Sequence, residues 1–252
     1  IAPTMALLDP YAGTACAIDE SIRNVVAAGG NPHRTALLDN FCWGDCRKED
    51  RLGSLVLAAE ACYDASIAFG APFVSGKDSL NNEYRVGDIE TAIPPTLLAT
   101  AVAPVDNTQL CPTTPLKKAG NLIVLLGTTT LAGGGAVAAE FLEIAYSQVP
   151  CPDFNTAPAL FDALYQAILA GHIASCHDLA EGGLAVAAAE MVMGSELSCT
   201  LDLNRIPGYS DLVPSAAMFA ETPTRFLLEV APDSMDALGE FFRVLPWAAI
   251  GE

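Results

Sequence analysis

The chain has 252 residues, of which 52% are hydrophobic and 17% are charged, so it can bury a substantial core and is not expected to be disordered. Its formal net charge of −18 argues against binding to nucleic acid or to an anionic membrane, because phosphate groups need a basic surface. No apolar stretch reaches the roughly 18 to 20 residues of a membrane-spanning helix, and we expect a cytoplasmic protein.

The two ends of the chain and its cysteines complete this picture. The sequence begins at Ile1 without an initiator methionine and ends in an apolar run, so we expect a fragment of a longer protein. Its eight cysteines are scattered along a core-rich chain and show no zinc-binding pattern. We expect them to be reduced and mostly buried.

The first part of the chain predicts an α+β module. Helices are expected at 14–28 and 52–69, strands at 34–38 and 96–102 and from Pro72, and a hairpin at 83–93. Between 104 and 119 the composition shifts to Pro, Thr, Asn and Lys, which marks a candidate domain boundary. The sequence therefore predicts one module at 1–112 and a second at 118–252.

The second part of the chain predicts another α+β module. Strands are expected at 121–127, 173–176, 198–203 and 225–230, and helices at 137–146, 158–170, 184–193, 211–220 and 232–244. Strands and helices alternate without a strict βαβ rhythm, which favours two α+β sandwiches over a doubly wound sheet.

The most informative stretch is 72–80, which reads PFVSGKDSL. We interpret it as a short buried strand that stops at a Ser-Gly turn and presents Lys77, Asp78 and Ser79 at the strand end, where ligands bind in α/β domains. A lysine beside glycine suits a phosphate, although the P-loop pattern is absent. A polar loop without function is the alternative. If the strand ending at Asp39 runs parallel to this one, Asp39 lies near Lys77.

A second candidate site combines a helix and a loop. Glu20 and Asn24 lie four residues apart and so share one helix face, where their oxygens can ligate Mg²⁺. The loop 176–184 carries His177, Asp178 and two glycines before a helix, a pattern that allows close approach to phosphate with Asp178 holding the metal. The alternatives are solvent-facing polar residues on the helix and a structural His177 that bonds to the backbone.

Five segments stand out over nearly the whole chain, at 20–24, 37–45 (LLDNFCWGD), 72–83 (PFVSGKDSLNNE), 177–183 (HDLAEGG) and 219–230 (FAETPTRFLLEV). Together, and in this order, they resemble phosphoribosylformylglycinamidine synthase, the glutamine-dependent amidating enzyme of purine biosynthesis. The wider superfamily includes aminoimidazole ribonucleotide synthetase. The resemblance implies that superfamily's two-module α+β fold, an N-terminal sheet-and-helix module that pairs into a barrel and a C-terminal α/β sandwich module.

The resemblance also implies the roles of single residues. Glu20, Asn24 and Asp178 match Mg²⁺ ligands of a nucleotide site, Asp39 and Gly76 match nucleotide contacts, and Ser79 matches a contact to the ribonucleotide substrate. Lys77 stands where shorter relatives have a metal-ligating asparagine, so it should contact phosphate or an acidic neighbour instead. Ala180 stands where some relatives have a serine that contacts the nucleotide, which removes one hydrogen bond.

The reaction implied is an ATP-driven carbon–nitrogen ligation that converts formylglycinamide ribonucleotide into formylglycinamidine ribonucleotide. This chain resembles most of the second synthetase half, so the expected partners are the first half and a glutaminase domain or subunit, with self-pairing through the N-terminal module as another possibility. We expect the chain alone to be inactive. Two alternatives stay open: a structural half that binds Mg-ADP without turnover, or another ATP-dependent member such as aminoimidazole ribonucleotide synthetase.

Overall fold

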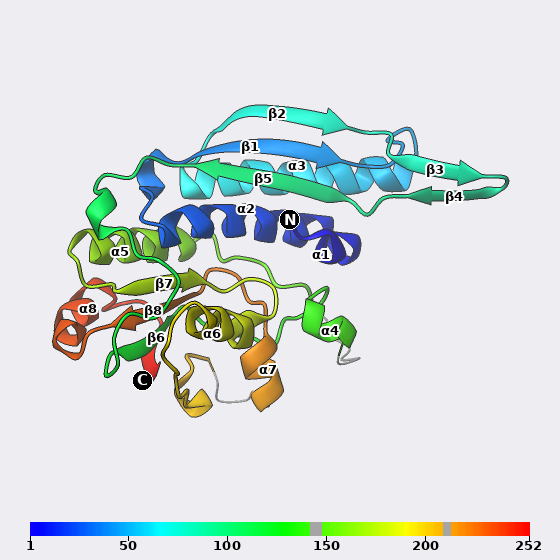
Figure 1. The fold of residues 1–252 in the computed structure, drawn as a ribbon. Coiled ribbons are helices and arrows are strands. Elements are labelled where there is room, and N and C mark those ends of the chain that lie inside the picture. The colour runs from blue at the N-terminus through cyan, green and yellow to red at the C-terminus, as the bar shows by residue number, and fades with distance from the viewer. Residues whose placement is uncertain (142–147, 209–212) are drawn as a thin grey trace.

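The computed structural model describes residues 1–141, 148–208 and 213–252. Its elements form an N-terminal and a C-terminal module, each with its own main sheet, and helix α2 lies between the two sheets (Figure 1). The elements of the N-terminal module are α1 (Pro3–Leu8), α2 (Pro10–Ala27), β1 (Ala36–Cys42), α3 (Glu49–Phe69), β2 (Phe73–Ser79), β3 (Glu83–Val86), β4 (Ile89–Ala92) and β5 (Thr96–Val102).

The N-terminal sheet has the order β2-β1-β5, with β1 parallel to β2 and antiparallel to β5. Alternate residues of these strands, such as Leu37 and Leu97, are buried in the core, whereas Leu98 and Val102 on the opposite face are 45% and 57% exposed. One face of the sheet therefore packs on the helices and the other is open. Strands β3 and β4 form the predicted separate hairpin.

The C-terminal module is a sandwich around a four-stranded antiparallel sheet of order β7-β8-β6-β9. Side chains alternate between a core shared with α5 and α8 and a second core against α6. Its elements are β6 (Leu122–Leu126), α4 (Val137–Phe141), α5 (Ala157–Leu169), β7 (Ser175–Asp178), α6 (Gly183–Met193), α7 (Pro214–Phe219), β8 (Phe226–Val230), α8 (Met235–Phe241) and β9 (Trp247–Gly251).

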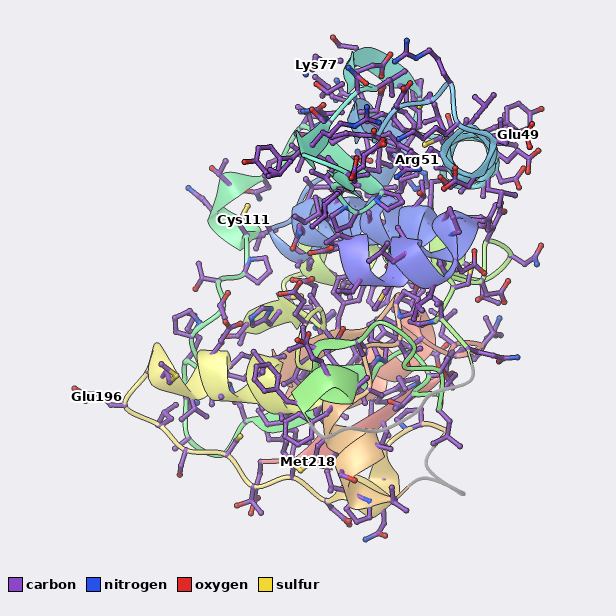
Figure 2. The ribbon with its side chains drawn as sticks, turned by 90° about the vertical axis from the view of Figure 1, so that its right-hand side faces the viewer. Glu49, Arg51, Lys77, Cys111, Glu196 and Met218 are labelled. Carbon is purple, nitrogen blue, oxygen red and sulfur yellow. The ribbon has the colours of Figure 1, made fainter. Side chains whose placement is uncertain are left out.

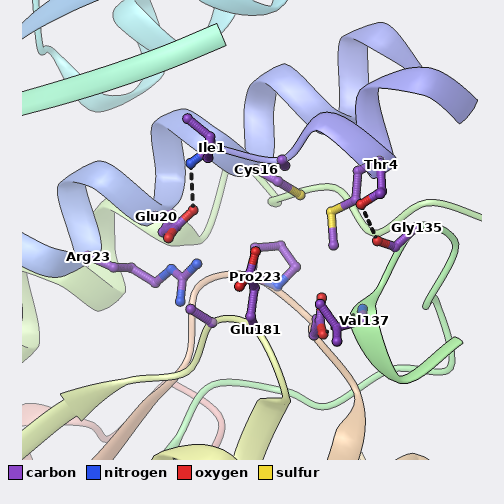
Figure 3. Close-up of a pocket in the computed structure, with 13 residues that line it drawn as sticks. Ile1, Thr4, Cys16, Glu20, Arg23, Gly135, Val137, Glu181 and Pro223 are labelled. Carbon is purple, nitrogen blue, oxygen red and sulfur yellow. Dashed lines mark hydrogen bonds and ion pairs between the residues drawn. The ribbon is translucent and has the colours of Figure 1, made fainter. Parts of the chain in front are cut away.

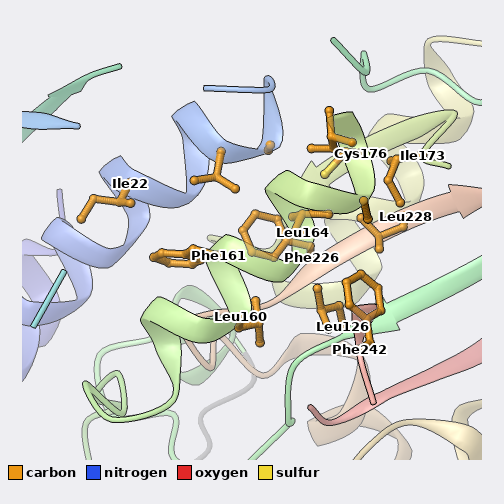
Figure 4. Close-up of a cluster of buried hydrophobic side chains, with 14 of the residues drawn as sticks. Ile22, Leu126, Leu160, Phe161, Leu164, Ile173, Cys176, Phe226, Leu228 and Phe242 are labelled. Carbon is orange, nitrogen blue, oxygen red and sulfur yellow. The ribbon is translucent and has the colours of Figure 1, made fainter. Parts of the chain in front are cut away.

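Helix α2 joins the two modules through one continuous core. Its buried residues Ile18, Ile22 and Val26 belong to the same cluster as Phe161 and Leu164 of α5 (Figure 4). The helix begins where the Asp9 side chain accepts a hydrogen bond from the Ala12 amide at 3.0 Å, with Pro10 in the first turn. This core fixes α2 against the C-terminal module. The polar residues of α2 that lie between the two modules are therefore held in fixed positions.

Most expected elements are confirmed, two are wrong, and two helix ends lie outside the described residues. β2 does not stop at Ser75-Gly76 but continues to Ser79, because it pairs with β1 along its whole length. The expected strand at 198–203 is an isolated bridge at Leu201 followed by a 3₁₀ turn at Leu203–Arg205. The ends of the helices expected at 137–146 and 211–220 fall on residues outside those described.

Helix α3 corrects the expectation about apolar stretches. Among the described helices, it is the one that is long and apolar enough to cross a membrane, with a mean hydropathy of 1.3 over its most apolar window. The helix buries Ala58, Ala61, Cys62 and Ala65 on one face and ends at Gly70, whose φ is 60°. Its length and composition therefore do not distinguish a core helix from a spanning one.

The cysteines are all free. Cys16, Cys62 and Cys176 are buried, while the other five are partly or fully exposed, so the expectation that most are buried is wrong. Burial raises the pKa of the Cys62 thiol to about 12, with a further contribution from the charge of Asp39.

Candidate functional site

A cleft of about 470 Å³ lies between α2 and the C-terminal module. It is lined by Glu20 of α2, by His177 and Asp178 at the end of β7, and by Ala180 and Glu190. A smaller adjoining cavity shares Glu20, Ala180 and Glu181 with the cleft and adds Arg23 and Glu221 (Figure 3). Residues far apart in the sequence therefore meet at one boundary between the modules.

The two predicted ligands on α2 differ in their environment. Glu20 is partly buried and lines both cavities. Asn24, one turn further along, is exposed and is not among the residues that line either cavity. Both residues lie on α2, but of the two only Glu20 lines the cleft.

Asp178 is a buried carboxylate with two charged neighbours. Its Oδ2 lies 3.4 Å from Nη1 of Arg23, and its Oδ1 lies 3.4 Å from Nδ1 of His177. Burial by itself would raise the pKa of Asp178, but the hydrogen bond from His177 and the charge of Arg23 outweigh it and lower the pKa. Asp178 is therefore ionised, as a metal ligand has to be.

His177 is bonded differently from the prediction. Its Nε2 lies 2.6 Å from Oε2 of Glu190, and its Nδ1 faces Asp178, so its partners are two carboxylates and not the backbone. The hydrogen bond with Asp178, followed by that with Glu190, raises the pKa of His177.

Glu221 holds the loop at 179–183, which lines the site, through backbone hydrogen bonds. Its Oε1 accepts hydrogen bonds from the amides of Gly182 and Val137, both at 2.9 Å. Gly183 has a φ of 60°, and a β-carbon there would lie 2.3 Å from the carbonyl oxygen of Ala220. Only glycine allows the loop to approach this segment so closely.

The other predicted site residues lie on the N-terminal sheet, away from the cleft. Asp39 pairs with Gly76 and Asn40 with Lys77 in the parallel register of β1 and β2. Because successive residues of a strand face opposite sides, Asp39 and Gly76 face the helices, whereas Lys77 and Ser79 lie on the open face. Lys77 donates a hydrogen bond from Nζ to the Ser79 hydroxyl. Figure 2 shows Lys77 with the sheet and α2 between it and the C-terminal module.

The predicted parallel pairing is confirmed and places Asp39 one position from Lys77 in the register, but the two side chains lie on opposite faces of the sheet because the strand continues where a turn was expected. The chain also does not bring Lys77 into one pocket with Glu20 and Asp178. The predicted residues form two groups, a cleft group of Glu20, Asp178 and Ala180 and a sheet group of Asp39, Gly76, Lys77 and Ser79.

Sequence reasoning missed three residues that build the cleft. Asp19 and Arg23 form a buried ion pair within α2, with 2.5 Å between Oδ2 and Nε, and Glu221 holds the loop as described above. The sequence signal for the ion pair was a carboxylate and an arginine four residues apart among small apolar residues. Burial of either charge alone would be strongly unfavourable, so the two are expected to pair. Glu221 had no local signal, because its partners are backbone amides of distant segments.

The donors of the cleft fit a metal ion that arrives with a polyphosphate. Within residues 1–141, 148–208 and 213–252, no three His, Cys, Asp or Glu side chains are arranged to hold a metal ion. Glu20 and Asp178 can supply two carboxylates. Mg²⁺ is commonly bound by one or two protein carboxylates, with phosphate and water oxygens completing its shell.

Curated proteins match nearly the whole length of this chain. The chain is 33% identical to the phosphoribosylformylglycinamidine synthase subunit PurL of Deinococcus radiodurans, over 99% of this chain and 34% of that protein. The corresponding subunit of Thermoplasma acidophilum is 30% identical, over 99% of this chain and 32% of that protein. The chain thus spans about a third of the length of the curated relatives it matches.

Solved structures share the fold. Thermotoga maritima PurL complexed with FGAR superimposes with a TM-score of 0.74 at 23% identity, over 98% of this chain and 40% of that one. The hydrogenase maturation protein HypE gives a TM-score of 0.68 at 15% identity, over 95% of this chain and 73% of that one. At these identities the likeness concerns the fold.

Two family models match the sequence in the order of the modules. The N-terminal domain model of AIR synthase related proteins matches residues 1–103, and the C-terminal domain model matches residues 118–252. Since the C-terminal match alone covers more than half of the chain, the chain belongs to the AIR synthase related protein family.

Proposed function

We propose that this chain is part of the synthetase region of a phosphoribosylformylglycinamidine synthase and that the cleft beside α2 binds a nucleotide with Mg²⁺. The observation that carries the proposal is that Glu20 and Asp178, from different modules, line one cleft with the backbone of the loop around Ala180. The similarity to PurL subunits and the PurL structures solved with ATP and ADP support it.

The charge of the cleft explains why a metal ion would be needed. Glu20, Asp178, Glu181 and Glu190 line it, and a polyphosphate alone would be repelled by these carboxylates. When bound, Mg²⁺ would neutralise phosphate charge. The chain's own contribution is to hold Asp178 ionised and the loop amides in place.

Titration calorimetry of this chain with Mg-ADP tests the proposal. We expect binding, and we expect Asp178→Asn to lower the affinity at least tenfold, which corresponds to about 1.4 kcal/mol. Asp162→Asn is the matched control, because Asp162 also lies beside a histidine, with 2.7 Å to His33 Nε2, but on α5 outside the cleft. No binding at millimolar Mg-ADP, or an unchanged affinity of Asp178→Asn, would overturn the proposal.

A structural nucleotide is the second candidate function, and one observation favours it. Arg23 is the only arginine or lysine among the described residues that line the two cavities, and it is already bonded to Asp19 and to the Leu179 carbonyl. Phosphoryl transfer needs cationic groups on the transferred phosphate. We therefore expect the chain to bind Mg-ATP without hydrolysing it, which a phosphate-release assay checks.

The open face of the N-terminal sheet is the proposed position of the other partners. It exposes Val74, Leu98 and Val102 beside Lys77 and Ser79. A sheet with one uncovered apolar face is suited to packing on another module, and we propose that the first synthetase half packs there. We further propose that formylglycinamide ribonucleotide contacts Ser79 and that a glutaminase supplies the ammonia. Turnover of that ribonucleotide with ammonia by this chain alone would contradict a shared site.

A further inference from the structure

Arg23 is a buried cation at the boundary between the modules. Only 4% of the residue is exposed, and its guanidinium has partners on both sides of the boundary. Within α2, Nε donates to Asp19 Oδ2 at 2.5 Å. Across the boundary, Nη1 donates to the Leu179 carbonyl and lies 3.4 Å from Asp178 Oδ2. One side chain therefore reaches the two residues at which β7 ends.

Asp19 extends the same contact to the neighbouring strand. Its Oδ2 accepts a hydrogen bond from the Thr224 amide at 3.0 Å, and its Oδ1 accepts one from the Thr224 hydroxyl at 2.5 Å. Thr224 has a φ of 57°, the only positive φ of a non-glycine residue in the described part of the chain. A β-branched residue in this conformation is strained, so these two hydrogen bonds hold it there.

The two contacts converge because β7 and β8 are neighbours. Asp178 pairs with Phe226 in their antiparallel register, so the chain after Asp178 and the chain before Phe226 leave the sheet at the same end of the two strands. A single turn of α2 from Asp19 to Arg23 holds both segments. Asp178 and Ala180 line the cleft at this same end of the strands.

We propose that Arg23 is a positioning residue of the cleft, which orients the Asp178 carboxylate and the loop at 179–183 for a metal–nucleotide ligand. This rests on the proposed function for the identity of the ligand. The distances of 3.4 Å from Asp178 to Arg23 and to His177 exceed the roughly 2.7–2.9 Å of a strong charge-assisted hydrogen bond. The carboxylate is thus oriented by its neighbours and keeps the capacity to accept a metal ion.

Replacing Arg23 by lysine separates charge from geometry. Lysine keeps the positive charge between the buried Asp19 and Asp178, but its ammonium is a point charge that cannot reproduce the planar fork of the guanidinium. The matched control is Arg34→Lys, because Arg34 is an exposed arginine at 3.9 Å from Asp106, outside the cleft. If Arg23→Lys does not fold, Asp19→Asn takes its place, because it loosens the guanidinium while leaving the charge of Arg23.

The first measurement is hydrogen–deuterium exchange of the chain without nucleotide. The Leu179 amide donates to the Arg225 carbonyl at 3.0 Å, and the Gly182 amide donates to Glu221. We expect exchange in the peptide that covers 179–183 to become at least tenfold faster in Arg23→Lys and to stay unchanged in Arg34→Lys. Unchanged exchange at 179–183 in Arg23→Lys would overturn the positioning role, whether or not a nucleotide binds.

The second measurement is the Mg-ADP affinity of Arg23→Lys, Asp178→Asn and the double variant. We expect each single variant to bind at least tenfold more weakly and the double variant to lose less than the two single losses combined, because part of the effect of Arg23 passes through Asp178. Fully additive losses, or an unchanged affinity of Arg23→Lys, would overturn the proposal. If the parent chain binds no Mg-ADP but exchange at 179–183 responds as expected, the nucleotide function fails while Arg23 remains the residue that positions the loop.

Discussion

Asp39 and Gly76 face each other on adjacent parallel strands so closely that a side chain at position 76 would have to displace the Asp39 carboxylate. A β-carbon on Gly76 would lie 2.3 Å from Oδ1 and 2.5 Å from Oδ2 of Asp39. Burial, together with the charge of Asp78, raises the pKa of Asp39. The glycine therefore makes space for a carboxylate on the helix side of the sheet.

We predict that Gly76→Ala destabilises the chain through this contact. The added methyl group must displace the Asp39 carboxylate, which is the movable end of a side chain beside an exposed edge strand, so we expect a cost of about 1 kcal/mol, the lower limit for overpacking. Urea unfolding measures the change in free energy of unfolding. In an Asp39→Ala background the same substitution should cost much less, because the obstructing carboxylate is gone. An equal cost in both backgrounds would show that Asp39 is not the cause.

Gly53 gives the opposite prediction for a glycine. It lies inside α3, and a β-carbon there would meet nothing within 4 Å. Gly53→Ala should therefore stabilise the chain by about 0.5–1 kcal/mol through helix propensity and a lower entropy of the unfolded chain. The same unfolding assay checks it. Gly70→Ala, at the end of α3 with a φ of 60°, is the contrasting variant and should destabilise the chain by about 1 kcal/mol.

Arg225 is a fully buried cation whose partners are neutral. It donates to the carbonyls of Thr222 at 2.9 Å and Ala220 at 2.5 Å and to the Thr129 hydroxyl at 2.9 Å. Among the described residues, no carboxylate lies within salt-bridge distance of it. Burial lowers the pKa of Arg225 to about 9, with a smaller contribution from the charge of Arg23.

We predict that Arg225→Met lowers the free energy of unfolding by about 2–4 kcal/mol. Each buried acceptor that loses its donor costs about 1–3 kcal/mol, and removal of the buried charge offsets part of that cost. Urea unfolding measures the change. Arg243→Met is the control, because Arg243 is exposed and its replacement should leave the free energy of unfolding nearly unchanged. A loss below 1 kcal/mol would mean that the hydrogen bonds only offset the cost of burying the charge.

Much of the fold was predictable because its signals are local. Helix α3 is bounded by Gly70, β5 was predicted with its observed ends, and the hairpin turns at Gly87 as its sequence indicates. The end of β2 was not predictable in this way, because the residues Ser75 to Ser79 are polar and resemble a turn. They form a strand because β1 offers them partners, which is tertiary information.

The candidate site was predictable in its ligands but not in its supports. Glu20 and Asp178 could be proposed from oxygen chemistry and from the family resemblance, since each has a local pattern around it. The contact between Asp19 and Thr224 joins residues 205 positions apart, and no periodicity reports such a contact. The same holds for the opposite orientations of Asp39 and Lys77, which follow from a strand that the sequence did not reveal.

The last prediction concerns Glu221 and pH. Burial raises the pKa of this carboxyl above its ordinary value of 4.5, and the amides of Gly182 and Val137 only partly oppose that rise. The folded chain therefore binds the Glu221 proton more tightly than the unfolded chain does. Its contribution to stability is largest below pH 4.5 and falls as the pH rises from there to the folded pKa.

Glu221→Gln should remove this dependence and keep the loop in place, because an amide oxygen can still accept from the Gly182 and Val137 amides. We expect the free energy of unfolding of Glu221→Gln to improve relative to the parent chain as the pH rises from about 4 to about 7. Glu221→Ala, which leaves the two amides without an acceptor, should lose about 1–3 kcal/mol across the same range. Urea unfolding of the three proteins at several pH values measures both effects. Parallel pH profiles for the parent chain and Glu221→Gln would show that the Glu221 carboxyl titrates alike in the folded and unfolded chains.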